Sequence, residues 1–370
     1  MKLTGEEATA AMRIERVEVS RLSVPLIRPY RLSFGDLVAF DTLLVELIDA
    51  DGRISFGEAT VLTGYTDETI DSAWAVSREL ADTCAGKTGA VLRASADAIG
   101  GSSPFAATAF LTALDMLGEH HALSFAEPVR VPLLALLNAD DAETTRDEFE
   151  TLLAQGYRTV KVKVGLSGSD DRARVARIQE VVAGRARIRI DANQAFTGPE
   201  AAQLLADLDP EGIELFEQPC AAADWAAHAS AARASRVPLM LDESIYDLAD
   251  IERAGAEQLA AYVKVKLAKF TSLDRLTEAV LRIKALGMQA VLGNGVACDP
   301  GCWMEACVAA RHIDNAGEMN GYLKVRTPLL ANPPRLERGD MVIEAGYRPV
   351  LDRGSIEHQR IALHTSGSPR

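Results

Sequence analysis

Alternating apolar and polar positions open the chain. Two such runs extend from Arg13 to about Glu58, and "DADG" at residues 49–52 is typical of a hairpin turn. Helical periods follow at about 67–80, 89–99 and 103–120. An antiparallel sheet followed by helices predicts an α+β module in the first third of the chain.

Near Pro132 the pattern changes, because short apolar runs begin to alternate with helical stretches, the first of these at about 142–155, 170–184 and 198–208. Repeated strand–helix units predict parallel strands with right-handed crossovers, and eight of them predict a (β/α)₈ barrel or a close relative of it. The eight strand candidates are "VPLLALL", "TVKVKVG", "RIRIDAN", "GIELFEQP", "PLMLDES", "YVKVKLA", "QAVLGNG" and "DNAGEMNG".

These patterns divide the chain into four parts. We expect a flexible extension at residues 1–12, an α+β domain at 13–128, the barrel at 129–322, and a C-terminal return at 323–370 that packs on both domains. We expect the catalytic residues to lie in the barrel.

Composition narrows the class of protein. The net charge of −14 and the scattered Lys and Arg residues disfavour nucleic-acid binding, and no apolar run is long enough to span a membrane. The first twenty residues resemble no export signal, so we expect a cytoplasmic protein. The five cysteines lack any CxxC pair and are expected to be free thiols.

Polar residues stand at the carboxyl ends of the barrel strands, where catalytic groups of such barrels lie. From Asp191 onward they recur every 24 to 28 residues, which is the length of one strand–helix unit. A single acid after a strand is most often a helix cap, but three on consecutive strands would repel one another unless a cation lies among them. These strand-end residues are Lys163, Asp191, Glu217, Asp242, Lys266, Asn294 and Glu318.

The three carboxylates Asp191, Glu217 and Asp242 indicate a hard divalent ion. All three are oxygen ligands, and no His or Cys stands at the same level of the barrel. We predict Mg²⁺, with Mn²⁺ as a substitute.

The strand "TVKVKVGL" carries two lysines on one face, because side chains alternate along a strand. In an isolated KxK pattern, the two lysines most often form a solvent-exposed face of the strand. Here a metal and the charge of Lys161 would both lower the pKa of Lys163 toward that of a general base. With Lys266 on the other side of the proposed metal, the arrangement predicts removal of a proton adjacent to a carboxylate, through an enediolate.

Five motifs, "KVKVG", "DANQAF", "FEQP", "LDES" and "VKLAK", occur in an order and at a spacing that resemble the enolase superfamily, and within it the muconate-lactonizing enzyme subgroup. The resemblance implies a modified TIM barrel with an N-terminal α+β capping domain that is completed by the C-terminal segment. It implies Asp191, Glu217 and Asp242 as Mg²⁺ ligands. It also implies Lys163 and Lys266 as acid/base residues on opposite faces.

By the same resemblance, Lys161 assists with charge and with the substrate carboxylate, and Asn193 and Glu243 orient the groups around the metal. Lys264 has two interpretations, a buried charge with a carboxylate partner or a catalytic amine. No histidine stands at the end of strand six or seven, which disfavours sugar-acid dehydration.

At the predicted eighth strand, "GEMNG" offers Glu318 and Asn320 where dipeptide epimerases have an Asp-x-Asp pair. Glu318 either pairs with a substrate amine or serves as a cap or buried acceptor. Specificity is expected in two loops of the capping domain, where Tyr30, Phe34 and Tyr65 either line the pocket or pack the lid.

The leading prediction is a racemase or epimerase of an amino-acid or imino-acid derivative. A muconate-type cycloisomerase or a hydroxyproline-type syn dehydratase shares the same intermediate. Two alternative functions belong to other classes of protein. One is a Schiff-base aldolase with Lys163 as nucleophile, and the other is a binding protein without catalysis. We expect a small carboxylate substrate and a homo-oligomer.

Overall fold

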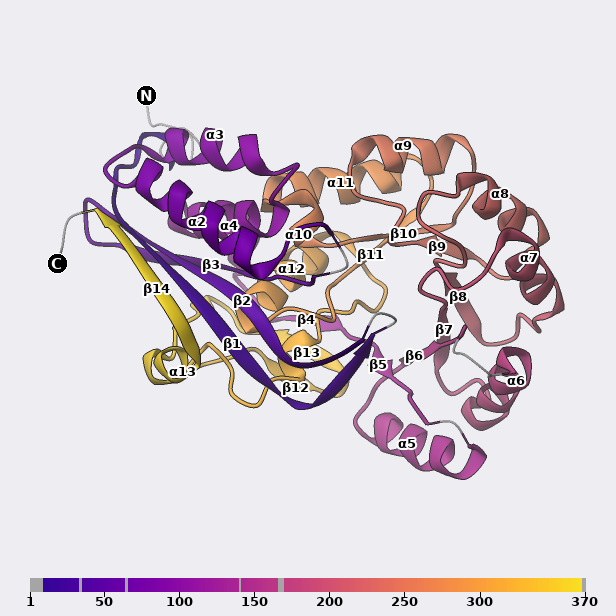
Figure 1. Cartoon of the computed structure of the whole chain (residues 1–370). Coiled ribbons are helices and arrows are strands. Elements are labelled where there is room, and N and C mark those ends of the chain that lie inside the picture. The colour runs from indigo at the N-terminus through magenta and orange to yellow at the C-terminus, as the bar shows by residue number, and fades with distance from the viewer. Residues whose placement is uncertain (1–8, 33–34, 64–65, 140, 166–169, 368–370) are drawn as a thin grey trace.

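The computed structural model describes residues 9–32, 35–63, 66–139, 141–165 and 170–367. Residues 1–8 of the expected flexible extension lie outside the described residues, as do Phe34 and Tyr65. The chain forms an antiparallel sheet with helices at one side and a curved parallel sheet with its own helices at the other (Figure 1).

The first sheet has the strand order β14-β1-β2-β3, all antiparallel, with β1 at Ile14–Leu32, β2 at Gly35–Asp49, β3 at Ile54–Thr60 and β14 at Arg360–Gly367. The predicted turn at "DADG" joins β2 to β3. Asp49 Oδ1 accepts hydrogen bonds from the backbone N–H groups of Asp51 at 3.0 Å and Arg53 at 2.8 Å, which is the local bonding that favours Asp in turns.

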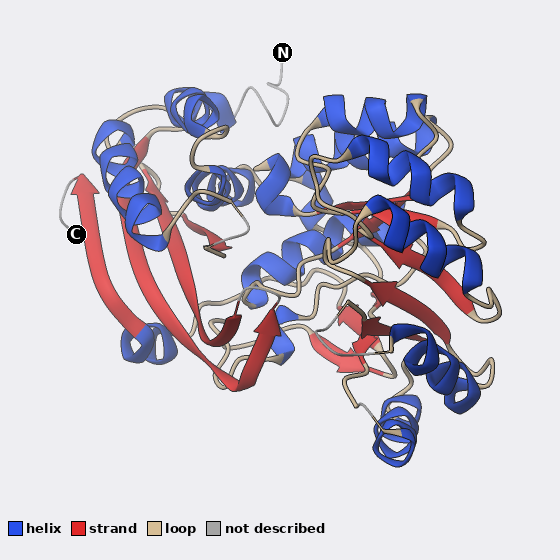
Figure 2. Ribbon diagram, turned by 45° about the vertical axis from the view of Figure 1, so that its right-hand side comes forward, coloured by secondary structure: helices blue, strands red, loops and turns tan. Residues whose placement is uncertain are grey.

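Three helices cover one face of this sheet (Figure 2). They are α2 (Ile70–Cys84), α3 (Gly89–Ile99) and α4 (Pro104–Leu117), close to the predicted ranges. Helix α4 carries apolar residues almost all round and is buried along most of its length, so it forms the centre of the core between the sheet and the other two helices.

The second sheet is parallel, with seven strands in chain order. Helices lie on its outer side, as strand–helix crossovers require (Figures 1 and 2). The strands are β5 (Ala135–Leu136), β6 (Thr159–Lys163), β7 (Arg187–Asp191), β8 (Ile213–Glu217), β9 (Leu239–Leu241), β10 (Tyr262–Val265) and β11 (Gln289–Leu292). The helices are α5 (Ala142–Ala154), α6 (Asp171–Val182), α7 (Gly198–Asp207), α8 (Trp225–Ala234), α9 (Leu248–Ala256), α10 (Leu267–Phe270), α11 (Leu273–Ala285) and α12 (Asp299–His312).

The prediction of eight regular barrel strands is wrong in one respect. In the described part of the chain, the eighth candidate forms only a single parallel bridge, between Gly317 and Leu133. It nevertheless closes the barrel, because Glu318 N–H donates to Leu292 O at 3.0 Å and Leu134 N–H donates to Gly317 O at 3.0 Å. A Cβ at Gly317 would lie 2.6 Å from Leu292 O, so this close backbone approach requires glycine.

The C-terminal residues return to both sheets. Strands β12 (Arg335–Glu337) and β13 (Asp340–Ile343) form a small antiparallel sheet with β4 (Val129–Pro132), which precedes the barrel. After α13 (Arg353–Gln359), β14 pairs with β1. Short 3₁₀ turns lie at His121–Leu123 and Gly321–Leu323.

Two further expectations concern the chain as a whole. The five cysteines are free and buried, as the sequence predicts. Among the helices of the described residues, none has both the length and the apolar character that crossing a bilayer requires.

Candidate active site

Strand β6 places its two lysines as the alternation predicts. Val160 and Val162 point outward into the core under α5 and α6, so Lys161 and Lys163 point into the barrel. Lys161 is almost fully buried, with 3% of its side chain exposed, whereas 26% of the Lys163 side chain is exposed. Lys163 is therefore the more accessible of the two to a ligand.

The predicted strand-end residues surround one cavity of about 330 Å³ at the carboxyl ends of the strands. Glu217 lies just beneath the cavity lining, in contact with its lysines. The residues that line this cavity from the strand ends and the loops that follow them include Lys161, Lys163, Asp191, Asn193, Asp242, Glu243, Lys264, Lys266, Asn294 and Glu318.

Two lysines whose side chains are 3% exposed link the carboxylates in the wall of the cavity. Lys161 Nζ lies 2.8 Å from Asp191 Oδ2, 2.7 Å from Glu217 Oε2 and 2.7 Å from Glu318 Oε1. Lys264 Nζ lies 2.9 Å from Glu217 Oε1 and contacts Glu318 Oε2. Lys264 thus has the carboxylate partners expected of a buried structural charge, and its charge is compensated.

The two proposed acid/base residues face the cavity from different sides. Lys163 Nζ donates to Asp191 Oδ2 at 2.7 Å and also bonds Asn193 Oδ1. Lys266 Nζ donates to Asp242 Oδ2 at 2.8 Å. Strands β7, β8 and β9 separate the strands that position these amines, so the two lysines flank the carboxylate cluster from opposite directions.

The expected lowering of the Lys163 pKa depends on a bound metal as well as on Lys161, and the chain by itself supplies only part of that effect. Burial and the charge of Lys161 both act to lower the pKa of Lys163, as predicted, but the attraction of Asp191 outweighs them and the pKa is raised. Burial likewise opposes the charge of Lys161, yet Asp191, Glu217 and Glu318 hold its pKa well above the ordinary value. A neutral Lys163 therefore requires that its contact with Asp191 be weakened.

The carboxylates divide into two electrostatic classes. Burial acts to raise the pKa of Asp191, but Lys161, Lys163 and Lys264 lower it to about 2. Burial, followed by repulsion from Asp242, raises the pKa of Glu243 to about 7. Asn193 Nδ2 donates to Glu243 Oε1 at 3.0 Å, and Glu243 Oε2 is buried without a hydrogen-bond partner among the described residues.

The donor set fits a hard cation. Asp191, Glu217 and Asp242 offer only oxygen atoms, and the unpartnered Glu243 oxygen lies in the same group, where a cation or its water would satisfy it. Within the described residues, no group of three His, Cys, Asp or Glu side chains is close enough together to bind a metal ion directly. The ammonium groups of Lys161 and Lys264 lie between the carboxylates. A dication would take over contacts that the lysines make.

Glu318 and Asn320 are both engaged inside the protein. Glu318 contacts the two buried lysines, which hold its pKa well below the ordinary value against the effect of burial. Asn320 Nδ2 donates to Leu134 O at 3.1 Å, and its Oδ1 accepts from Lys324 Nζ at 3.0 Å. Glu318 thus matches the buried-acceptor interpretation, since its charge is already paired.

Lys269 is a residue of this site that the sequence reasoning did not assign. Its Nζ donates to Asp242 Oδ1 at 2.9 Å and to Asp242 O at 2.6 Å, and it lies 5.1 Å from the centre of the Tyr246 ring. Burial lowers the pKa of Lys269 to about 8. The signal was present in "KLAK", because a spacing of three places Lys269 on the same side of the short helix α10 as Lys266.

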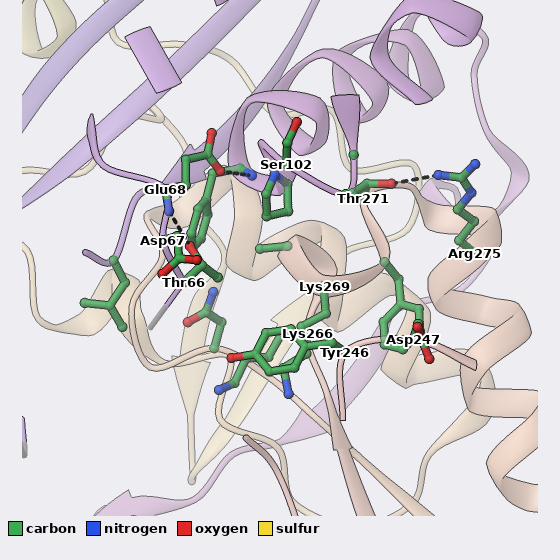
Figure 3. A pocket seen from close by; sticks show the side chains of 18 of the residues that line it. Thr66, Asp67, Glu68, Ser102, Tyr246, Asp247, Lys266, Lys269, Thr271 and Arg275 are labelled. Carbon is green, nitrogen blue, oxygen red and sulfur yellow. Dashed lines mark hydrogen bonds between the residues drawn. The ribbon is translucent and has the colours of Figure 1, made fainter. Parts of the chain in front are cut away.

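A second, larger cavity of about 980 Å³ adjoins the first (Figure 3). Leu62, Tyr246, Lys266, Asn294 and Val296 line both cavities. Figure 3 shows residues of the first domain, among them Thr66, Asp67, Glu68 and Ser102, facing residues of the barrel such as Tyr246, Asp247 and Lys266. Both domains therefore build the space beside Lys266.

Glu68 fixes the first-domain wall of this cavity. Its Oε2 accepts a hydrogen bond from Phe105 N–H at 2.8 Å, at the start of α4. Burial raises the pKa of Glu68 to about 7. The bond holds the loop that follows β3 against the helix.

Comparison with known proteins identifies the family. Residues 144–348 match the family described as "Enolase C-terminal domain-like", which is more than half of the chain. The chain is also 31% identical to muconate cycloisomerase 1-2 of Acinetobacter lwoffii over 71% of this chain and 72% of that protein. The chain belongs to the enolase superfamily.

Other members of the enolase superfamily match over most of the chain. An L-Ala-D/L-Glu epimerase of Clostridium acetobutylicum is 25% identical over 91% of this chain and 94% of that protein. A crystal structure of a dipeptide epimerase from Enterococcus faecalis V583, complexed with Mg and the dipeptide L-Leu-L-Tyr, has a TM-score of 0.81 at 22% identity, and the match covers 91% of this chain and 98% of that one. The enolase-superfamily chain is thus an isomerase or lyase with the modified barrel of that superfamily, as the resemblance predicts.

Proposed function

We propose that this enzyme removes and returns the proton next to the carboxylate of an amino-acid or imino-acid derivative, and so racemises or epimerises it. Asp191, Glu217 and Asp242 would hold Mg²⁺, in line with their oxygen donors and with the Mg of the dipeptide epimerase complex. When bound, Mg²⁺ supplies positive charge against the negative charge that develops on the substrate carboxylate.

The observation that carries this proposal is the placement of Lys163 and Lys266. Their amines reach the cavity from β6 and β10, and each contacts a different carboxylate. An amine on each side of a bound substrate can take the proton from one face and deliver a proton to the other. Lys161, buried beside Lys163, adds positive charge and disfavours a second ammonium next to it.

Each amine needs to lose a proton before it can act as a base. Lys163 is held in its charged form by Asp191, so weakening of that ion pair lowers its pKa. Asn193 bonds both Lys163 and Glu243 and fixes the orientation of the Lys163 amine. Lys269 occupies the other oxygen of the carboxylate that Lys266 contacts, so Asp242 cannot rotate freely.

A muconate-type cycloisomerase is the second candidate, since the relative of 31% identity carries that name. Cycloisomerisation needs one amine to protonate or deprotonate the carbon next to the carboxylate, whereas racemisation needs two. The number of essential lysines therefore separates the candidates.

The test is deuterium uptake in D₂O with Mg²⁺, followed by NMR, on a library of N-acyl amino acids, proline derivatives and dipeptides of both configurations. We expect exchange of the α-proton and loss of optical purity with at least one compound. Lys163→Ala and Lys266→Ala should each stop racemisation, while one of them retains exchange with a single enantiomer. Lys284→Ala is the matched control, because Lys284 is exposed on α11, away from the cavity.

Two outcomes contradict the proposal. Normal racemisation by both alanine variants would remove the two-amine assignment. Trapping of a carbonyl substrate on Lys163 by borohydride, with activity independent of Mg²⁺, would support a Schiff-base aldolase instead.

A further inference from the structure

Lys266 directly precedes the short helix α10 and is its N-cap residue. Its backbone is extended, with φ −138° and ψ 146°, and its side chain makes no capping hydrogen bond. That side chain reaches Asp242 and both large cavities instead. The N–H groups at the start of α10 therefore need an acceptor from another part of the chain.

Glu305 on α12 supplies this acceptor. Its Oε1 accepts a hydrogen bond at 2.7 Å from the N–H of Leu267, the residue after Lys266. Glu305 is 1% exposed, and its other oxygen is buried without a hydrogen-bond partner among the described residues. The contact with Leu267 is thus the single hydrogen bond of this side chain within the described part of the chain, and it fixes the backbone beside the proposed base.

Glu58 on β3 holds α12 from the first domain. Its Oε2 accepts from Gly301 N–H at 3.0 Å and its Oε1 from Cys298 N–H at 3.4 Å. A Cβ at Gly301 would lie 2.5 Å from Glu58 Oε2, so this close approach requires glycine. Gly301 and Glu305 are four residues apart and lie on the same side of α12. Glu58 therefore fixes the turn of α12 that leads to Glu305.

These contacts surround one small cavity of about 20 Å³. Glu58, Leu267 and Glu305 line it, and so does Asn294, which also lines both larger cavities. Helix α10 lies against α4, and α12 lies against β3, at the junction of the two domains (Figure 1). The backbone at Lys266 is thus supported by a chain of contacts that begins in the first domain.

We propose that Glu305 is a positioning residue for Lys266, because its contact with Leu267 fixes the direction from which the proposed base reaches the substrate, and that Glu58 holds Glu305 in place from the first domain. The inference rests on the proposed function, which assigns Lys266 to one face of the substrate. Glu305 lines neither of the larger cavities and acts through Lys266. Lys163 is carried by β6, which three strands separate from β10, so loss of the Glu305 contact should affect one amine only.

The test uses variants that remove or keep this hydrogen bond. Glu305→Met keeps the length of the side chain and removes the acceptor, whereas Glu305→Gln keeps a carbonyl acceptor. Burial raises the pKa of Glu305 to about 8, so its carboxyl is mostly neutral near neutral pH and the amide is a close mimic. Leu267→Pro removes the same bond from the donor side, at the first helical position, where proline is tolerated.

Asp115→Leu is the matched control. Asp115 on α4 is also a buried acid that accepts the first N–H of a barrel helix, that of Leu273 on α11, at 3.0 Å. The control therefore loses a contact of the same kind between the same two domains.

The first measurement is the initial rate of α-proton exchange in D₂O with Mg²⁺, taken for each enantiomer separately. The alanine variants of Lys163 and Lys266 show which enantiomer Lys266 serves. For that enantiomer, Glu305→Met and Leu267→Pro should lower the rate by about tenfold or more, because a small displacement of a reacting group has an effect of this size. The other enantiomer should keep its rate, Glu305→Gln should resemble wild type, and Asp115→Leu should leave the ratio of the two rates unchanged.

The second measurement does not depend on turnover. Amide hydrogen exchange of residues 266–271, followed by mass spectrometry, reports how firmly α10 is held. Exchange should be several-fold faster in Glu305→Met than in wild type or in Glu305→Gln.

Three results overturn the inference. They are equal rate losses for both enantiomers in Glu305→Met, a wild-type ratio of the two rates in Glu305→Met or Leu267→Pro, and wild-type hydrogen exchange of α10 in Glu305→Met. Absence of α-proton exchange by wild type with every carboxylate tested contradicts the proposed function instead. The two failures are distinguishable, because hydrogen exchange of α10 is measured without substrate.

Discussion

Lys269 donates a hydrogen bond to Asp242 Oδ1 at 2.9 Å, on the oxygen opposite to the one that Lys266 contacts. The two amines hold the Asp242 carboxylate from both sides. The side chain of Lys269 is 2% exposed, and its amine donates to both Oδ1 and the backbone O of Asp242, so we assign it as a positioning residue.

Lys269→Met should weaken Mg²⁺ binding by about tenfold to a hundredfold, the range found when a group that orients a metal ligand is removed. The variant retains the Lys266 contact but lets Asp242 rotate. Half-activation by Mg²⁺ and calorimetric titration measure the effect, with Lys284→Met as the exposed control. Wild-type Mg²⁺ affinity in Lys269→Met would show that Lys269 serves packing alone.

Asp242→Asn should abolish turnover and raise the Mg²⁺ Kd by more than about tenfold, because an amide keeps the size of the side chain but loses its charge. Lys266 and Lys269 would then lose their shared anion. α-Proton exchange and Mg²⁺ titration are the measurements, and Asp147→Asn, on an exposed face of α5, is the control. Full activity in Asp242→Asn would remove this residue from the proposed ligand set.

Glu305 gives a prediction for stability against pH. It is fully buried on α12, accepts from Leu267 N–H at 2.7 Å, and burial raises its pKa to about 8 from its ordinary value of 4.5. The folded state therefore binds an extra proton between these two pH values, and the stability that this proton contributes is present below about pH 4.5 and lost as pH rises to about 8.

Glu305→Gln keeps an acceptor for Leu267 and has no charge to bury. The free energy of unfolding of wild type should fall relative to this variant as pH rises from about 5 to about 8, by an amount on the order of a few kcal/mol. Urea unfolding at several pH values measures the difference. Glu180→Gln, exposed on α6, should show no such trend. Parallel curves for wild type and Glu305→Gln would contradict the prediction.

Much of the candidate site follows from the sequence because it depends on local geometry. Alternation along β6 places Val160 and Val162 on one face and Lys161 and Lys163 on the other, and the apolar face packs into the core under the helices. The regular spacing of acids at strand ends brings Asp191 and Glu217 to neighbouring strands of a parallel sheet, where they pair in register.

Other features depend on residues that are distant in sequence. The eighth barrel position has the sequence pattern of a strand, but among the described residues it forms a single parallel bridge, between Gly317 and Leu133. Its backbone contacts are set by segments that are distant in sequence, since Glu318 N–H donates to Leu292 O. The Lys163 pKa also depends on tertiary contacts, since Asp191, 2.7 Å from its amine, opposes the effects of burial and of the charge of Lys161.

The sequence by itself thus determined the repeating strand–helix pattern, the face of each strand and the residues at its end, because these depend on neighbours within a few positions. Only the tertiary structure decided which charges pair: Lys264 with Glu217 and Glu318, and Lys269 with Asp242. The physical reason is that the energy of a buried charge depends on distances of a few ångströms, which closure of the barrel and docking of the first domain fix.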